Sequence, residues 1–186
     1  MVDRISPIRN KSGFTLIELM AVVAVLSVTA LIAVPSMQQA IHSNQLRTEI
    51  SRILAAIKLA RSEAISRNTT VSMCPSSFVS TGTAACSRNY ADGWIVFTNR
   101  DRDRVVDRDS DEIIRVFEGL PGGYSLTNKA GTTAAFEVIS YRPDGSSRRN
   151  RTLMLCSPYG STIRSWSIVM NVVGRPRVAR GWGECL

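Results

Sequence analysis

The sequence predicts an α+β fold in which one long N-terminal helix packs on an antiparallel β-sheet head. Three features support this prediction: an apolar run from Phe14 to Val34, apolar residues at helical spacing beyond it, and strand-like alternation after residue 70. The chain has 186 residues and a net charge of +8. This length suits one domain with an appendage, and the charge favours phosphate-rich or other anionic partners.

The apolar run is long enough to span about 30 Å of hydrocarbon as a helix. Basic residues before it (Arg4, Arg9 and Lys11) predict that the N-terminus stays in the cytoplasm. A cut after Gly13 would precede the apolar core, unlike the cut of an ordinary secretory signal, and would leave the helix on the mature protein. We therefore expect three parts: a cleaved leader over residues 1–13, a transmembrane or filament-core helix over 14–35, and a globular head with a basic tail over 36–186.

Glu18 lies inside the apolar run. A carboxylate in a lipid-embedded helix costs about 2–3 kcal/mol or more, so it needs a reason. If cleavage frees an amine at Phe14, a neighbouring copy can present that positive charge to Glu18. The pair would be satisfied only in a filament, which favours assembly in register. The alternative is a glutamate that reaches the membrane interface from near the helix end.

One long helix is expected from about Thr15 to Arg67. Pro35 removes one helical hydrogen bond, so a kink or local unwinding is expected there. Beyond Pro35, apolar residues recur at alternating steps of four and three, which lines one face of a helix that supports the head. The residues of this face are Leu46, Ile50, Ile53, Ile57, Ala60 and Ala64.

After residue 70 the pattern is typical of strands, separated by turn signals such as Asp92-Gly93 and Pro143 to Gly145. In the second expected strand, Trp94 and Val96 should face opposite Ile95 and Phe97. We expect these strands to form an antiparallel sheet on the amphipathic half of the helix. The expected strands are Thr70–Cys74, Gly93–Thr98, Ile113–Phe117, Ser125–Thr127, Ala135–Tyr141, Thr152–Cys156 and Trp166–Val172.

Four cysteines, Cys74, Cys86, Cys156 and Cys185, all follow the apolar run, and none forms a C-x-x-C motif. An even number of widely spaced cysteines fits disulfides formed in an oxidising compartment. Three pairings are possible. We favour Cys74 with Cys86 and Cys156 with Cys185, because each closes a local or C-terminal segment. The alternative is four buried thiols in a reducing compartment.

The run from Gly13 to Glu18 (Gly-Phe-Thr-Leu-Ile-Glu) resembles the type III signal of type IV prepilins and type II secretion pseudopilins. The resemblance implies cleavage by a prepilin peptidase after Gly13, methylation of the new Phe14 amine, and a role for Glu18 in subunit docking. It also implies a single-pass protein of the inner membrane with its head in the periplasm, which then enters a filament. A simple single-pass anchor is the alternative.

Further stretches resemble the GspH/FimT group of minor pilins and pseudopilins: Leu59–Ile65, Cys74–Ser76, Cys86 and Asp92–Phe97. With the N-terminal signal they cover the first hundred residues. The remainder matches loosely, through strand spacing and the segment Gly174–Arg177. The resemblance implies a type IV pilin-like fold, other pilins as partners, and a place near the filament tip.

The segment from residue 99 to residue 112 is dense in carboxylates and arginines. Five of its acids fall near positions 1, 3, 7, 9 and 12 of a calcium-binding loop. However, position 6 is Val106 instead of glycine, and four arginines (100, 102, 104 and 108) would repel a divalent cation. We expect a solvated hairpin tip whose charges neutralise one another, and no metal site. The acids are Asp101, Asp103, Asp107, Asp109 and Glu112.

The C-terminal part carries most of the excess charge. From Arg142 to Leu186, eight arginines and no lysine accompany two acids, Asp144 and Glu184. Arginine pairs bidentately with phosphate and stacks on bases. Pro176 favours an extended chain, from which flanking arginines would project, and Trp182 adds a stacking surface. The arginines are at positions 142, 148, 149, 151, 164, 175, 177 and 180.

Some GspH/FimT-type minor pilins act in DNA uptake, and the resemblance implies a Gly-Arg-x-Arg tail that contacts the DNA backbone. Gly174, Arg175 and Arg177 match that pattern. We therefore expect a minor type IV pilin that captures double-stranded DNA for natural transformation through phosphate contacts, which weaken with salt and ignore sequence. The expected contact residues are Arg148, Arg149, Arg151, Arg175, Arg177 and Arg180.

The alternative function is a structural minor pilin or a type II secretion pseudopilin that primes filament assembly without binding DNA. Its basic face would then dock on an acidic pilin or on the membrane surface. An enzyme is not expected, because His42, the single histidine, lies just beyond Pro35 without an evident partner for catalysis. The sequence contains no phosphate-cradling glycine loop and no zinc-ligand set, so no cofactor is expected.

Overall fold

The computed structural model describes residues 13–107, 109–159, 165–183 and 185. It contains two compact units, Met1–Ala40 and the head, Ile41–Leu186. One helix, α1 (Leu16–Ser66), contributes residues to both units, and its bounds agree with the prediction to within one residue at each end. Of the predicted leader, all but Gly13 lies outside the described residues.

The first turns of α1 have a local cap and an apolar surface. Thr15 Oγ1 accepts a hydrogen bond from the Glu18 amide at 3.3 Å, the N-cap pattern in which a threonine satisfies a free amide of the first turn. The helix continues through Pro35, so the local unwinding expected there is not seen. Every large apolar side chain between Phe14 and Met37 is at least 46% exposed. Among the described residues, one helix is long and apolar enough to cross a membrane.

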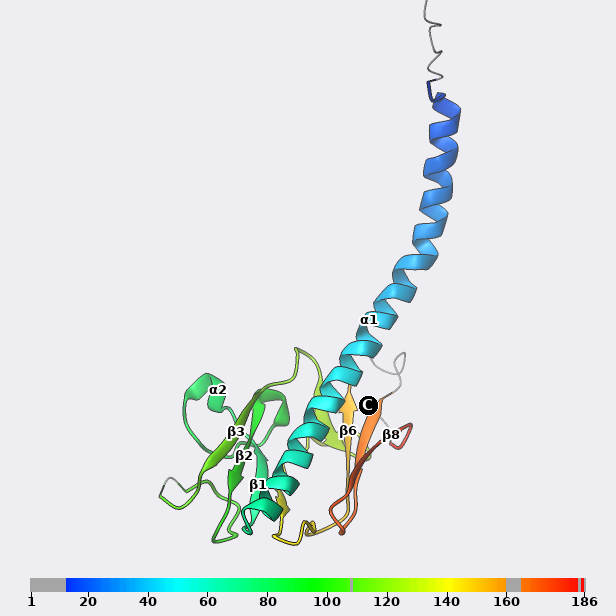
Figure 1. The fold of residues 1–186 in the computed structure, drawn as a ribbon. Coiled ribbons are helices and arrows are strands. Elements are labelled where there is room, and N and C mark those ends of the chain that lie inside the picture. Colours follow the sequence, from blue (N-terminus) through cyan, green and yellow to red (C-terminus); the bar gives the residue numbers. More distant parts are fainter. Residues whose placement is uncertain (1–12, 108, 160–164, 184, 186) are drawn as a thin grey trace, which may run out of the picture. The chain divides into compact units, whose positions relative to one another are not determined.

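The head combines the second half of α1 with two four-stranded antiparallel sheets (Figure 1). Sheet A has the strand order β3-β2-β1-β5, and sheet B has the order β4-β6-β7-β8. This arrangement confirms the α+β class and corrects the expectation of one sheet. The strands are β1 (Val71–Pro75), β2 (Gly93–Thr98), β3 (Ile113–Glu118), β4 (Ser125–Asn128), β5 (Ile139–Tyr141), β6 (Arg151–Cys156), β7 (Trp166–Met170) and β8 (Pro176–Arg180). Two short helices, α2 (Phe78–Thr81) and η1 (Tyr90–Asp92), join β1 to β2.

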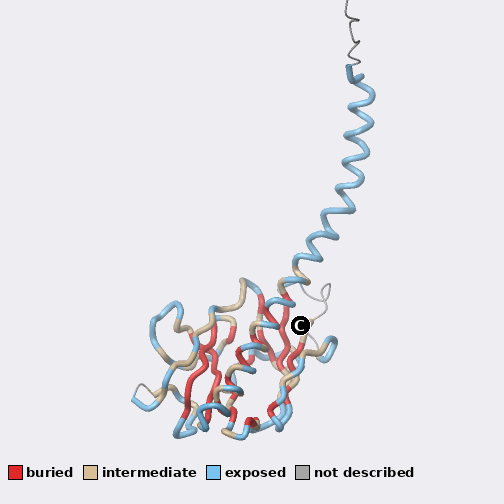
Figure 2. The backbone as a smooth tube through the Cα atoms, in the orientation of Figure 1, coloured by how far each residue is buried: buried red, intermediate tan, exposed pale blue. Residues whose placement is uncertain are grey.

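One apolar seam of α1 packs against both sheets. All six residues of the predicted face, from Leu46 to Ala64, are buried, so the predicted core face is confirmed. They form a single cluster with side chains of sheet A, such as Val96, and of sheet B, such as Ile168. Figure 2 shows the buried backbone along this half of α1 and along the strands beside it.

Strand β2 is buried on both faces, as its continuous apolar sequence predicts. Trp94 and Val96 belong to the main core, whereas Ile95 and Phe97 pack with Cys74 in a second cluster. The expected division of these four residues between two faces is therefore confirmed.

Two disulfides tie loops to the sheets. Cys74 of β1 bonds to Cys86, and Cys156 at the end of β6 bonds to Cys185, each with a Cα–Cα distance of 5.6 Å. This is the favoured pairing of the three. The second bridge fixes Cys185 to the end of strand β6 in sheet B.

The predicted strand Ala135–Tyr141 is wrong in its first half. The Ala135 amide donates to the Leu126 carbonyl at 2.8 Å on sheet B, whereas Ile139 pairs with Met73 on sheet A. The segment between them crosses from one sheet to the other, so it cannot continue either ladder. Alternation of apolar residues does not reveal such a crossing.

The predicted strand Trp166–Val172 ends earlier, and a further strand follows it. The Gly174 amide donates to the Asn171 carbonyl at 2.9 Å, which turns the chain back after Met170. The segment expected to be merely extended then pairs with β7 as strand β8. Pro176 is tolerated because it is the first residue of an edge strand.

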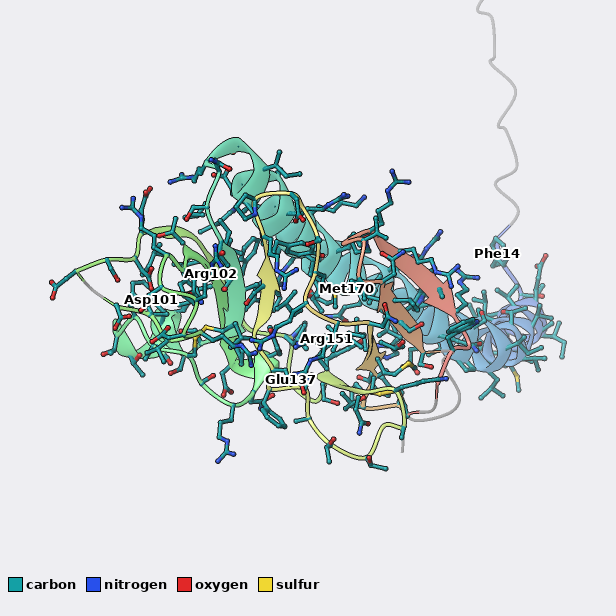
Figure 3. The ribbon with its side chains drawn as sticks, turned by 90° about the horizontal axis from the view of Figure 1, so that it is seen from below. Phe14, Asp101, Arg102, Glu137, Arg151 and Met170 are labelled. Atoms are coloured by element: carbon teal, nitrogen blue, oxygen red, sulfur yellow. A yellow bond between two sulfur atoms is a disulfide. The ribbon has the colours of Figure 1, made fainter. Side chains whose placement is uncertain are left out.

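Glu137, in the segment that crosses between the sheets, holds the two arginines at the start of β6. Its carboxylate lies 2.9 Å from Arg151 Nη2 and 3.7 Å from Arg149 Nη1; Figure 3 labels Glu137 and Arg151. The Arg151 side chain is only 11% exposed, and burial lowers the pKa of its guanidinium. Glu137 therefore offsets part of the cost of burying the Arg151 charge.

Replacing Glu137 with glutamine should lower the free energy of unfolding of the head by about 1–3 kcal/mol, because a nearly buried guanidinium loses its charge partner. Urea denaturation of the full chain in a neutral detergent measures this change. Glu118→Gln, which removes an exposed carboxylate without an ion pair to any described residue, should change the free energy by less than about 0.5 kcal/mol. Equal losses in the two variants would contradict the assignment.

Candidate nucleic-acid interface

Strand β8 forms the edge of sheet B and carries the arginines of the C-terminal tail. Arg175 precedes the strand, Arg177 lies opposite Val169, and Arg180 lies opposite Trp166. All three arginines are exposed. Because side chains alternate along a strand, Arg177 and Arg180 lie on opposite faces of the sheet.

Two tryptophans restrain the arginines of β8. The Arg180 guanidinium lies 4.1 Å from the centroid of the Trp166 ring, and Arg47 of α1 approaches the same ring at 5.9 Å. Arg177 lies 5.4 Å from the centroid of Trp182, with Lys129 at 5.6 Å. Such contacts orient a cation without neutralising its charge.

Trp182, expected to offer a stacking surface, is 48% exposed. The cations of Arg177 and Lys129 lie over its ring. A base could stack on Trp182 in place of one of these cations and would then lie beside the remaining positive charge, which suits a nucleotide.

A contact between two turns positions Arg175. Gly174 has a positive φ of 80°, and a Cβ at this position would overlap the Gly145 carbonyl oxygen. The same oxygen accepts a hydrogen bond from Arg61 Nε of α1 at 3.0 Å. A glycine is therefore needed immediately before Arg175, both for backbone conformation and for close approach.

A shallow groove of about 400 Å³ joins the start of β8 to α1. Lys58, Arg61 and Arg175 contribute its positive charges, and Ser62, Ile65 and Pro176 complete its lining. Sequence reasoning missed Lys58 and Arg61. Helical spacing places both residues off the core face of α1, but it does not show that the tail lies beside them. We name the set Lys58, Arg61, Arg175, Arg177 and Arg180 the β8 surface.

The predicted arginines at positions 148, 149 and 151 lie in the loop before β6 and at the first residue of that strand, and the structure gives them different surroundings. Arg151 is corrected: its nearly buried guanidinium is committed to Glu137, so it is not available to a nucleic acid. Arg149 shares that carboxylate at longer range and remains exposed. Arg148 is exposed and lines a separate pocket with Arg142. Arg164 lies outside the described residues.

The acidic loop between β2 and β3 gathers three carboxylates, from Asp101, Asp107 and Asp111, within 4.8 Å of one another. Burial, followed by repulsion from neighbouring aspartates, raises the pKa of Asp107. Asp111 accepts the amides of Arg100 and Asp107, at 3.3 and 3.2 Å. Glu112 instead pairs with Arg67 at 2.7 Å. These hydrogen bonds give the carboxylates a role in shaping the loop.

The predicted processing and docking residues lie at the start of α1. Phe14, labelled in Figure 3, is exposed, and so is Glu18. The Glu18 carboxylate forms no ion pair with any described residue. It is therefore free to meet a charge from another copy of the chain.

Comparison with known families gives two matches. The family described as type II transport protein GspH matches residues 49–174, more than half of the chain. The prokaryotic N-terminal methylation motif matches residues 8–34. The GspH match ends at Gly174, immediately before the arginines of the tail. No curated protein matches the chain.

Two solved structures resemble this chain. The type IV minor pilin FimU of Pseudomonas aeruginosa superposes with a TM-score of 0.55 at 17% identity, covering 73% of this chain and 89% of that one. The minor pseudopilin EpsH from the type 2 secretion system of Vibrio cholerae gives a TM-score of 0.48 at 13% identity, with coverages of 73% and 97%. The FimU similarity supports the type IV pilin-like fold, and the two sequence matches identify the family. The chain belongs to the GspH family of minor pilins and pseudopilins.

Proposed function

We propose that this protein is a minor type IV pilin whose head binds double-stranded DNA electrostatically for uptake in natural transformation. The observation that carries the proposal is the β8 surface, where five cations from α1 and the tail form no ion pair with any described residue. Unpaired guanidinium groups at an exposed edge suit the phosphate backbone of DNA.

The arrangement of the β8 surface favours contacts to phosphate over contacts to base edges. Its charges lie on both faces of an edge strand and in the adjacent groove, and rings or backbone contacts restrain several of them. Phosphate contacts position a protein on DNA without reading its sequence. The proposed role is therefore binding, with Arg148 and Arg149 as flanking contacts.

The N-terminal unit supports the assembly part of the proposal. Its exposed apolar surface is suited to a lipid bilayer before assembly and to neighbouring helices in a filament afterwards. A prepilin peptidase would cut after Gly13 in the inner membrane, with the head in the periplasm. Glu18 would then meet the Phe14 amine of a neighbouring pilin, and the subunit would sit near the filament tip.

Replacing Arg175 and Arg177 together with alanine should weaken binding of a duplex by about tenfold or more at about 50 mM salt. The slope of log affinity against log salt should fall by about 2, one for each lost phosphate contact. Gel shifts of the full chain in a neutral detergent across a salt series measure both quantities.

The matched control for this pair is Arg88→Ala with Arg115→Ala, which removes two exposed arginines from outside the β8 surface. It should leave affinity and slope nearly unchanged. If the control weakens binding equally, net charge is the cause and the tail is not the site. If the unaltered chain shows no salt-sensitive binding, the chain is a structural subunit that primes assembly.

Replacing Gly174 with alanine should reduce DNA affinity without removing a charge, because Cβ would push the tail away from Gly145 and Arg61. The free energy of unfolding should also fall by about 1–3 kcal/mol. Gly82→Ala is the control, since Gly82 also has a positive φ, of 68°, but open space around it. Gly82→Ala should keep full DNA affinity; a Gly174→Ala protein with unchanged affinity would refute the positioning role.

Replacing Gly13 with leucine should leave an uncut precursor, because the side chain would obstruct the peptidase at the scissile bond. Intact mass spectrometry of the membrane fraction should then show the chain with all thirteen leader residues. Ser12→Ala, one residue earlier, is the control and should be cut normally. A mature-length mass for the leucine variant would disprove processing at this bond.

A further inference from the structure

A second group of cations lines a pocket of about 330 Å³ in the head. Arg102 and Arg104 come from the loop between β2 and β3, and Arg142 and Arg148 come from the loop between β5 and β6. In Figure 3, Arg102 lies between Asp101 and the strands. Four arginines from two loops therefore line one space.

These four arginines lack the close ion pairs and ring contacts that several other arginines of the head have. Arg52, Arg67 and Arg151 pair with carboxylates, and Arg88 and Arg115 lie over aromatic rings. The pocket arginines form no ion pair, side-chain hydrogen bond or ring contact with any described residue. Positive charges that line one space repel one another, and an anion bound between them would add attractions that offset this repulsion.

Two buried polar side chains, Thr70 and Asn99, line the same pocket. Thr70 is 6% exposed and Asn99 is 0% exposed, yet Thr70 Oγ1 and Asn99 Oδ1 have no hydrogen-bond partner in the part of the chain that the structure describes. A buried polar atom without a partner is costly. Because both residues line the pocket, a ligand bound there could supply the missing hydrogen bonds.

The hydrogen bonds of Asn99 allow it to present a donor to an anion. Its Nδ2 lies 3.1 Å from Ser72 Oγ, which also bonds to Ser140 Oγ at 2.8 Å. A half-turn of the amide lets the Ser72 hydroxyl donate to Oδ1 and places Nδ2 at the position where the amide has no partner, on a residue that lines the pocket. The Thr70 hydroxyl supplies a second neutral donor.

Nearby acids do not occupy the pocket. The clustered carboxylates of Asp101, Asp107 and Asp111 belong to the β2–β3 loop but do not line the space. Asp144 is close enough to Arg142 for the two charges to interact. Its carboxylate, however, accepts the Ser146 amide at 2.8 Å and lies outside the lining.

We infer that this pocket binds a phosphate monoester, either free or at the end of a nucleic acid strand. Guanidinium groups approach from two loops while Thr70 and Asn99 donate from the buried wall. A terminal phosphate has three oxygens to meet these donors together, whereas a backbone phosphodiester has two unbridged oxygens. The pocket is separate from the β8 surface and does not depend on DNA binding there.

Isothermal titration of the full chain in a neutral detergent with inorganic phosphate, at constant ionic strength in chloride, tests the pocket. Binding should saturate at one phosphate per chain. Arg142→Ala with Arg148→Ala should weaken it by about tenfold or more, and Arg102→Ala from the other loop should weaken it as well. The control pair, Arg88→Ala with Arg115→Ala, should leave it unchanged.

Three results would overturn the inference: no saturable phosphate binding, equal binding by the pocket variants, or loss of phosphate binding in the Arg175→Ala, Arg177→Ala protein alone. Failure of duplex binding with phosphate binding intact would refute only the proposed function. A short oligonucleotide with and without a 5′-phosphate identifies the source. Tighter binding of the phosphorylated strand assigns the pocket to nucleic acid ends, and equal binding assigns it to a free phosphate monoester.

Discussion

The head depends on the apolar seam of α1, because this seam joins two sheets whose hydrogen-bonded ladders are separate. Burial of apolar surface supplies the free energy that holds them to one helix. Near the end of the helix the buried residues of the seam are Ala60 and Ala64. Their small side chains allow the neighbouring core elements to pack close to the helix backbone. A larger residue at either position would separate the layers.

Closing both sheets on one helix also brings distant loops together at the end of α1. Arg61 donates to the Gly145 carbonyl, against which Gly174 packs. The loop between β5 and β6 thereby touches the β8 surface at Gly145, while its Arg142 and Arg148 line the second basic pocket. One loop connects two cationic sites that are far apart in the sequence.

Sequence reasoning succeeded where structure is local. The seam of α1 follows from helical spacing, and the favoured disulfides each close a local or C-terminal segment of the chain. It failed where the result depends on which segments become neighbours. The crossing before β5, the pairing of β8 with β7, and the burial of Arg151 against Glu137 are such cases. Lys58 joins the candidate interface for the same reason, because only the fold places the tail beside it.

Strand β8 is the last strand of sheet B, and among the described strands only β7 pairs with it, so its outer side is a sheet edge. Such an edge can recruit a strand from a second molecule and start aggregation, and charged side chains on the edge oppose that event. Arg177 and Arg180 stand on opposite faces of this edge. Two heads approaching edge to edge would bring like charges together on both faces, so the charge of the tail also opposes edge-to-edge association of these subunits.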